Sequence, residues 1–262
     1  MTRTPNSSLT NALHILKSFS IDEQELTLSD ITERIGVSKS TACRLVQTLE
    51  SEGFINQNTG FNTYSLGSSI LALSNTVVDQ IAILKETTHF LKKLSMQTKE
   101  SAHIAILENT DVIYLKKEDS QYRVQLRSHI GRRNPAHCTA SGLAILAQLN
   151  PHTVDMLYPE KLTRYTQYSL ATLEQLQQQL SIFRKQGYAV TKGHFIETII
   201  AIGAPVYNKQ HIAFASVSVA GPIKRILPNM DKIIEHVMTT SKQITQFIQT
   251  HEKEIDLETF IK

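Results

Sequence analysis

The chain has 262 residues, of which 41% are hydrophobic and 19% are charged, and its formal net charge is +3. This composition supports a folded core and excludes a disordered chain, while two cysteines are too few for a disulfide framework and favour the reducing cytoplasm. No apolar run approaches the ~20 residues of a membrane span, and the polar residues 1–10 do not form a secretory signal, so we expect a cytoplasmic protein with no membrane partner.

Charge is unevenly distributed along the chain. Residues 1–66 hold five basic and seven acidic side chains and are net −2, whereas the remainder is net +5. A weak net charge at first argues against a nucleic-acid partner, but net charge does not say where the charges lie. Any DNA binding by the N-terminal part must therefore depend on how its side chains are arranged.

The N-terminal part is predicted to contain three helices. Apolar residues at helical spacing predict the first over about 8–20. Thr27 followed by Asp30 resembles a capping box and opens a short second helix, which Gly36 would end. A serine cap then opens a third helix over 39–51. Two helices joined by a short turn that contains glycine are typical of a helix-turn-helix.

The third predicted helix has an apolar face and an opposite face that is rich in hydrogen-bond donors. The second face suits insertion into the major groove of DNA, with the N-terminus of the helix near a phosphate. Arg44 is the side chain most able to read a guanine edge, whereas Lys39 and its neighbours are better placed for phosphates. The residues predicted to contact DNA from this helix are Lys39, Ser40, Thr41, Arg44, Gln47 and Thr48.

A short hairpin is predicted after the third helix. Two β-type runs, 54–57 and 61–66, flank Asn58, Thr59 and Gly60, and a glycine in the turn fits a hairpin. A helix-turn-helix followed by a hairpin is a winged helix, and its tip, with Asn58 and Thr59, would touch phosphate or the minor groove. The spacing alone also fits a small helical domain with a polar exterior, or a winged helix that binds protein.

The segment after residue 66 is compatible with a long helix that reaches about residue 96. An apolar stripe follows it at spacings of three and four residues: Ile70, Leu73, Val77, Ile81 and Leu84. Two interpretations are open. The segment is either a buried helix of a second domain or a linker whose stripe pairs two subunits.

The rest of the chain mixes strands and helices, which indicates an α/β domain rich in antiparallel pairing. Apolar β-type runs alternate with helical segments that end at glycine or proline. The expected strands are 103–107, 112–115, 122–126, 199–207 and 212–219, and the expected helices are 140–149, 172–186 and 229–250.

Short motifs in both halves of the chain carry a resemblance to a known family. In the N-terminal half they are Leu26–Ile31, Gly36–Thr41, Thr48–Leu49–Glu50, Glu52–Phe54 and Tyr64–Gly67. In the C-terminal half they are Gly131–Arg133, Thr139–Gly142, Arg184–Tyr188, Ala204–Val206 and Ser216–Pro222. In this order, the motifs resemble the IclR family of bacterial transcription regulators over nearly the whole chain.

The resemblance implies an α+β protein in three parts. These are a winged helix-turn-helix DNA-binding domain (1–66), a linker and dimerisation helix (67–97) and a GAF-like effector-binding domain (98–262). It favours the linker interpretation and implies a homodimer, whose symmetry matches the two half-sites of a palindromic operator in double-stranded DNA. Pairing of dimers into tetramers stays open.

An effector pocket is expected where the small residues 138–142 enter a helix. Backbone N–H groups at a helix N-terminus favour an anion, including a carboxylate, and small side chains let a ligand approach. The family's members often sense small carboxylic acids. At the positions that match the family, the effector would be bound by Ala140, Ser141, Thr191, Ala201, Ser218 and Ala220.

This sequence departs from the family pattern at the pocket. Thr191 stands where an acidic residue is common, Ala201 replaces a cysteine of the small-carboxylate sensors, and Ala220 replaces a second serine. Leu143 stands where lysine is usual. Smaller and less polar side chains predict a pocket that is larger or more apolar than one for glyoxylate or pyruvate. Our hypothesis is an aromatic or longer carboxylate as effector.

Enzyme and cofactor chemistry are not indicated. His137 and Cys138 are adjacent in sequence, and adjacent residues rarely bring a nucleophile and its base into contact. The histidines and cysteines lack metal-ligand spacing and no glycine-rich phosphate loop occurs, so no metal or cofactor is expected. The alternative from another class is a cytosolic small-molecule-binding or hydrolytic protein whose winged helix does not bind DNA. Arg132 and Arg133 fit a solvated surface, the mouth of the effector pocket or a tetramer contact.

Overall fold

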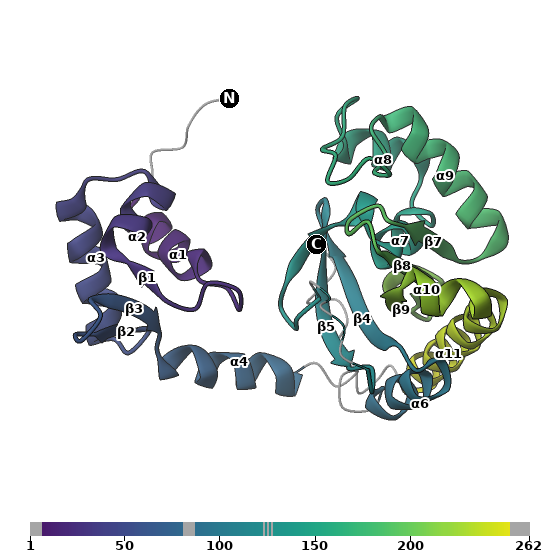
Figure 1. The fold of residues 1–262 in the computed structure, drawn as a ribbon, viewed down its shortest axis with the longest axis horizontal. Helices are drawn as coiled ribbons and strands as arrows, with labels where there is room; N and C mark the ends of the chain where they lie inside the picture. The colour runs from purple at the N-terminus through teal and green to yellow at the C-terminus, as the bar shows by residue number, and fades with distance from the viewer. Residues whose placement is uncertain (1–6, 81–86, 123, 125, 127, 252–262) are drawn as a thin grey trace. The chain divides into compact units, whose positions relative to one another are not determined.

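The computed structural model of the chain describes residues 7–80, 87–122, 124, 126 and 128–251 (Figure 1). The chain divides into two compact units, residues 1–80 and 81–262, and each is described by itself. Within the described part, no helix combines the length and apolar character that crossing a membrane requires. The α+β fold class predicted from the sequence is confirmed.

The first unit packs three helices against a small antiparallel sheet of strand order β1-β3-β2. Its core is formed by apolar side chains from all of these elements, including Ile15, Ile31, Val46 and Ile55, each of which is 1% exposed or less. The elements are α1 (Ser8–Ser18), β1 (Leu26–Thr27), α2 (Leu28–Ile35), α3 (Lys39–Ser51), β2 (Ile55–Asn58) and β3 (Thr63–Leu66).

The ends of α2 and the start of α3 follow the predicted capping chemistry. The Thr27 hydroxyl accepts from the Asp30 N–H, and the Asp30 carboxylate accepts from the Thr27 N–H, so both parts of a capping box are present. Gly36 ends α2 in the left-handed region at φ +66°, and the Ser38 side chain caps α3. These caps define where α2 begins and ends and where α3 begins.

The wing differs in detail from the prediction. Asn58 belongs to β2, so the turn covers residues 59–62. Its left-handed residue is Asn62, at φ 52°, and not Gly60. The two-residue strand β1 was not predicted, because it exists only through its pairing with β3, in which Leu26 lies opposite Tyr64.

Two helices occupy the predicted linker region, α4 (Ser68–Gln80) in the first unit and α6 (Thr88–Thr98) in the second. Ile81 and Leu84 of the predicted apolar stripe lie outside the described residues. Leu91 and Leu94 of α6 are fully buried in the core of the second unit, which is how a buried helix of that domain would behave.

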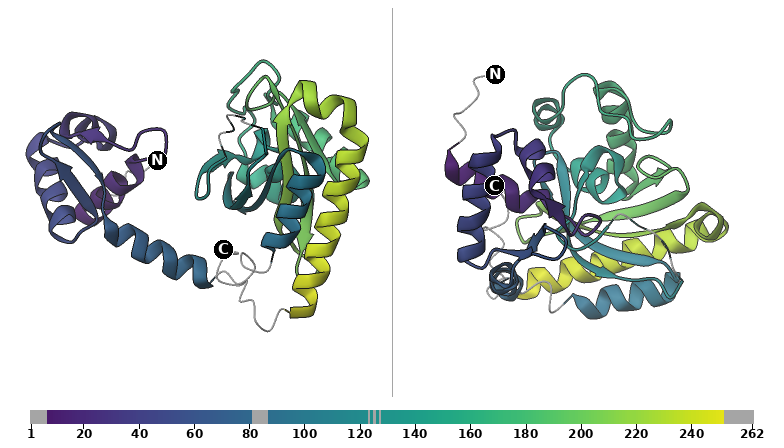
Figure 2. Two further views of the ribbon diagram at one scale, coloured as in Figure 1. Left: turned by 60° about the horizontal axis from the view of Figure 1, so that its bottom comes forward. Right: turned by 60° about the vertical axis from the view of Figure 1, so that its left-hand side comes forward.

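The second unit is built on a six-stranded antiparallel sheet of order β6-β5-β4-β9-β8-β7. Helices α6 and α11 cover one face, while α7 and α9 lie on the other (Figure 2). The strands are β4 (Ser101–Glu108), β5 (Asp111–Glu118), β6 (Arg133–Pro135), β7 (Ala189–Lys192), β8 (Ile199–Tyr207) and β9 (Ala213–Pro222). The helices are α7 (Ala140–Leu146), α8 (Pro151–Leu157), α9 (Leu173–Gln186), α10 (Ile223–Ile226) and α11 (Met230–His251).

Two expectations for the second unit were wrong. The run 122–126 was expected to be a strand, but its described residues Tyr122, Val124 and Leu126 lie in none, and the others fall outside the described part. This run lies beyond the end of β5, where the ladder with β4 stops at the pair Ala102 and Glu118. The helix expected over 140–149 ends at Leu146, and a separate helix, α8, begins after the Asn150 cap.

Candidate functional site: the α3 surface and a pocket on the sheet

The predicted DNA-contacting residues of α3 lie together on one surface of the first unit. Five of them are exposed, and Thr41 is half-buried, with its hydroxyl oxygen 2.9 Å from the Ser38 Oγ at the helix start. Ala42 and Val46 lie on the opposite side of α3 and are buried in the core. The exposed set is Lys39, Ser40, Arg44, Gln47 and Thr48.

Few positive charges are available on this unit. The Arg34 guanidinium is bound internally, 2.7 Å from a Glu23 carboxylate oxygen and 2.9 Å from the Ser18 carbonyl oxygen. Within the described residues, Lys39 and Arg44 make no ion pair, so both cations are available to a ligand of α3. The surface therefore offers two cations on a helix face that is otherwise polar and uncharged, which suits base-edge contacts more than extensive phosphate neutralisation.

The wing presents the predicted Asn58 and Thr59 at its tip, and both are exposed. The sequence reasoning missed Phe61, whose side chain is 78% exposed at the same tip. A large exposed aromatic ring beside polar residues is a feature that hairpin spacing alone does not single out.

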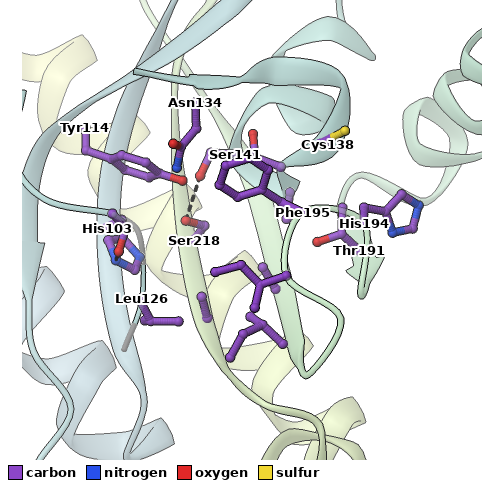
Figure 3. Close-up of a pocket in the computed structure, with 17 residues that line it drawn as sticks. His103, Tyr114, Leu126, Asn134, Cys138, Ser141, Thr191, His194, Phe195 and Ser218 are labelled. Carbon is purple, nitrogen blue, oxygen red and sulfur yellow. Dashed lines mark hydrogen bonds between the residues drawn. The ribbon is translucent and has the colours of Figure 1, made fainter. Parts of the chain in front are cut away.

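A pocket lies on the face of the second sheet that α7 covers (Figure 3). All six residues predicted to bind the effector line it: Ala140, Ser141, Thr191, Ala201, Ser218 and Ala220. The space between the lining residues is about 500 Å³, part of it open to solvent.

The pocket floor runs across neighbouring strands. Thr191 on β7 lies opposite Ala201 on β8, which lies opposite Ala220 on β9. In the next row of the ladder, Ser218 on β9 lies opposite His103 on β4. Side chains in equivalent ladder positions point to the same face of a sheet, so this floor is a direct consequence of the strand order.

Close backbone packing places α7 at one end of the pocket. A Cβ on Gly203 of β8 would lie 2.6 Å from the Ala140 carbonyl oxygen, and one on Gly142 would lie 2.3 Å from the Ala136 carbonyl oxygen. Position 203 therefore requires glycine for α7 to approach the sheet, and position 142 requires glycine for α7 to pack against the turn that contains Ala136. The Thr139 hydroxyl caps α7 by accepting from the Gly142 N–H.

A polar wall forms where α7 meets β9. The Ser141 and Ser218 hydroxyl oxygens are 2.8 Å apart, and Tyr114 and Asn134 lie next to them (Figure 3). Burial raises the pKa of the Tyr114 phenol, while hydrogen bonding with Asn134 and Ser141 opposes that rise. These groups remain neutral and can donate hydrogen bonds to an anionic oxygen.

His103 occupies the neighbouring part of the wall. Its Nε2 is 2.8 Å from the Ser128 Oγ, and both side chains are 5% exposed or less. Burial, together with the nearby Lys117 ammonium, lowers the pKa of His103 to about 3. The imidazole is therefore uncharged near neutral pH.

The opposite side of the pocket is formed by Thr191 and the loop that follows β7. His194 Nδ1 accepts from the Lys192 N–H at 3.1 Å, and burial lowers the pKa of His194. The Ser169 hydroxyl donates to the His194 carbonyl at 2.6 Å, and the Phe195 ring packs edge-on against Tyr165. This loop is thus held by side chains from a separate segment.

Apolar side chains complete the pocket, and sequence reasoning missed most of them. Leu126, Phe195, Ile196 and Ile199 are among the lining residues. With Ala201 and Ala220 in the floor, they make much of the pocket lining apolar. No sequence signal marked Phe195 or Tyr114, because only the strand order brings them to this cavity.

Cys138 lines the pocket but is not an activated nucleophile. Burial raises the pKa of its thiol to about 12, so it is protonated near neutral pH. The neighbouring His137 is buried too, and its Nε2 lies 3.0 Å from the Thr163 carbonyl oxygen. Among the described residues, no cluster of three potential metal ligands occurs.

Two of the motifs that carry the family resemblance, Arg184–Tyr188 and Gly131–Arg133, stabilise the fold of the second unit. The Arg184 guanidinium lies 2.6 Å from the Ala147 carbonyl oxygen and 2.7 Å from that of Leu149, so it satisfies carbonyls just beyond α7. Gly187 ends α9 in the left-handed region, at φ 82°. Arg133 forms an ion pair with Glu108 on the neighbouring hairpin, and Arg132 precedes β6.

Comparison with protein families decides what these two sites belong to. Residues 8–59 match the IclR helix-turn-helix domain, and residues 75–246 match the bacterial transcriptional regulator IclR C-terminal domain. The chain belongs to the IclR family. It is therefore a DNA-binding transcriptional regulator with an effector domain, and its family consists of regulators and not of enzymes.

Individual relatives match over most of the chain. The regulator XynR of Escherichia coli (strain K12) is 31% identical over 220 residues, which are 84% of this chain and 87% of that one. The p-hydroxybenzoate hydroxylase transcriptional activator of Acinetobacter baylyi is 26% identical and covers 92% of each chain. An IclR homolog from Microbacterium hydrocarbonoxydans, solved with 4-hydroxybenzoate, shares the fold with a TM-score of 0.81 at 20% identity, over 93% of this chain and 100% of that one.

Proposed function

We propose that this regulator binds a palindromic operator as a homodimer and controls a catabolic operon in response to a monocarboxylate with an apolar, ring-sized body. The observation that carries the proposal is the composition of the pocket. One end is a cluster of neutral hydrogen-bond donors, and the rest is lined by aliphatic and aromatic side chains. In the cytoplasm, such a pocket takes up an acid produced or consumed by the regulated pathway.

The carboxylate binds at the polar wall, against Ser141, Ser218, Asn134 and Tyr114. Two observations support this placement. The Ser141–Ser218 hydrogen bond can be exchanged for bonds to a ligand without leaving either hydroxyl unpaired. In addition, Ala140 and Ser141 are the first residues of α7, so their N–H groups have no acceptor within that helix.

An aromatic body accounts best for the apolar part. Phe195 offers a ring face or edge for stacking, and the alanines of the floor leave room for a flat group. Two relatives point the same way, since one is named for p-hydroxybenzoate hydroxylase and another was solved with 4-hydroxybenzoate. The acid class is thus supported by the lining and by the relatives independently.

Operator binding places α3 of each subunit in the major groove, with Arg44 reading a base edge and Asn58 and Thr59 of the wing reaching phosphate or the minor groove. Dimerisation through the N-terminal domain and the linker region has support in exposed apolar side chains. Leu9 on α1 is 70% exposed, and Leu71 and Leu73 on α4 are 64% and 55% exposed. Exposed apolar side chains such as these offer contact area to a second subunit.

A thermal-shift and calorimetric survey of organic acids tests the effector assignment. The purified full chain is titrated with pyruvate, glyoxylate, aliphatic monocarboxylates and benzoates. We expect the largest stabilisation from a benzoate, because only a ring fills the apolar part. Tighter binding of pyruvate or glyoxylate than of any bulkier acid would overturn the proposal.

A further inference from the structure

The pair His103 and Ser128 is a second polar group in the effector pocket, separate from the Ser141–Ser218 wall. His103 comes from β4 (Figure 3), Ser128 comes from the segment between β5 and β6, and both line the cavity. Their contact of 2.8 Å satisfies two buried polar side chains, yet both still face the ligand space. Polar groups placed in this way in an otherwise apolar pocket set the orientation and identity of a ligand.

The chemistry of this pair selects a neutral group. A neutral imidazole has one donor nitrogen and one acceptor nitrogen, and a serine hydroxyl both donates and accepts. A ligand hydroxyl matches them, since it too donates and accepts. A second carboxylate does not, because no lysine or arginine is among the described lining residues and the nearby Lys117 is paired with Asp119 at 2.7 Å.

The register of the sheet fixes where such a hydroxyl lies on the ligand. His103 is opposite Ser218 in the β4–β9 ladder, one strand or about 5 Å from it, and β4 lies between β9 with Ser218 and β5 with Tyr114. Along β8, Ile199 lies two residues before Ala201, on the side away from Gly203, against which α7 packs. A ligand whose carboxylate contacts Ser218 therefore presents the flank of its body, and not its far end, to His103.

We propose that His103 and Ser128 form a specificity-determining subsite for a hydroxyl on the flank of the effector. On a benzoate this is the meta position and not the para position. The proposal rests on the proposed function, because it places the carboxylate at the Ser141–Ser218 wall. It adds a second recognition element, and with it the ligand class of hydroxylated monocarboxylates.

Isothermal titration of the full chain with benzoate, 3-hydroxybenzoate and 4-hydroxybenzoate tests this subsite. We expect 3-hydroxybenzoate to bind about fivefold more tightly than benzoate, and 4-hydroxybenzoate to show no such gain. In Ser128→Ala and in His103→Phe, the ratio of the benzoate Kd to the 3-hydroxybenzoate Kd should fall to near one. His103→Asn, which keeps a donor and an acceptor, should retain part of the ratio.

Ser181→Ala serves as a control, because it replaces a serine on the exposed face of α9. It should keep the wild-type ratio of the benzoate Kd to the 3-hydroxybenzoate Kd. Equal affinity of the wild type for benzoate and 3-hydroxybenzoate would overturn the subsite and leave the proposed function standing. A preference for 3-hydroxybenzoate over benzoate that persists in both Ser128→Ala and His103→Phe would also overturn the subsite. If the wild type binds no benzoate at all, the proposed function fails, and the subsite fails with it.

Discussion

The polar face of α3 takes its side chains from ten consecutive residues, Lys39 to Thr48, whereas the pocket predicted to bind the effector takes its side chains from all six strands of the second sheet, from α7 and from the segments between them. On α3 the residues predicted to contact DNA are mostly exposed and contribute little to the core. In the pocket, the lining residues and the backbone beneath them are also packing elements. Substitutions on the polar face of α3 should therefore change DNA binding with little effect on stability. Substitutions in the pocket of the second unit should change both ligand binding and stability.

The largest expected effect follows from the contact between α7 and β8. In Gly203→Ala, the new Cβ meets the Ala140 carbonyl oxygen at 2.6 Å, so either α7 or β8 must shift. We expect a loss of about 3 kcal/mol in the free energy of unfolding and a loss of effector binding. Differential scanning calorimetry measures the first and isothermal titration the second. Gly60→Ala is the matched control, because its new Cβ would make only an ordinary contact, 3.6 Å from the Asn58 Oδ1. Equal melting temperatures for the two variants would contradict the prediction.

On α3, Arg44→Ala should weaken specific operator binding by about 2 kcal/mol if Arg44 reads a base, and it should leave effector affinity and melting temperature unchanged. Fluorescence anisotropy with an operator fragment selected from a random pool measures the effect. Lys17→Ala removes an exposed cation from α1 and should have a much smaller effect. Unaltered operator affinity in Arg44→Ala would remove that residue from base readout.

Acidification should affect the second unit through His103. The pKa of this group is about 3 in the folded chain and 6.5 ordinarily, so the unfolded chain takes up the proton first as pH falls. The contribution of His103 to the free energy of unfolding is fully present above the ordinary pKa of histidine. It declines as pH falls toward the pKa in the folded chain, by roughly 1 kcal/mol between about pH 7.5 and pH 5.5. Urea unfolding at the two pH values measures this loss. A His103→Asn variant should show a smaller loss, and an identical pH dependence would show that His103 does not contribute.

The smallest effect should come from the phosphate contacts. Because residues 1–66 are net −2 and Arg34 is bound to Glu23, few cations are available to neutralise DNA. Lys39→Gln should reduce the slope of log affinity against log salt by about 1 per subunit and weaken all sequences alike. Titrations at several salt concentrations check this, and a steep wild-type slope, like that of a heavily basic DNA-binding protein, would be inconsistent with the charge distribution.

The two sites also differ in how far sequence could predict them. The face of α3 follows from helical periodicity and two caps, which are local signals, and the structure places its residues as expected. The six pocket positions came from matching a family, and the structure brings them together. His103, Tyr114, Ser128 and Phe195 were missed, because their proximity depends on β4 lying between β5 and β9 and on how two loops fold over the sheet. The pairing order of distant strands leaves no trace in local spacing.

Strand β4 has a consequence for signalling that follows from its alternating side chains. His103 faces the ligand space, while its neighbours Ala102 and Ile104 face the other side of the sheet, in one core with Leu91 and Leu94 of α6. A ligand in the pocket would thus contact one face of β4, while α6 contacts the other face of the same strand. Because packed interiors have little slack, a ligand that displaces β4 by a fraction of an ångström displaces α6 with it. A displacement of β4 in the pocket would then be transmitted through the sheet to α6 on its other face.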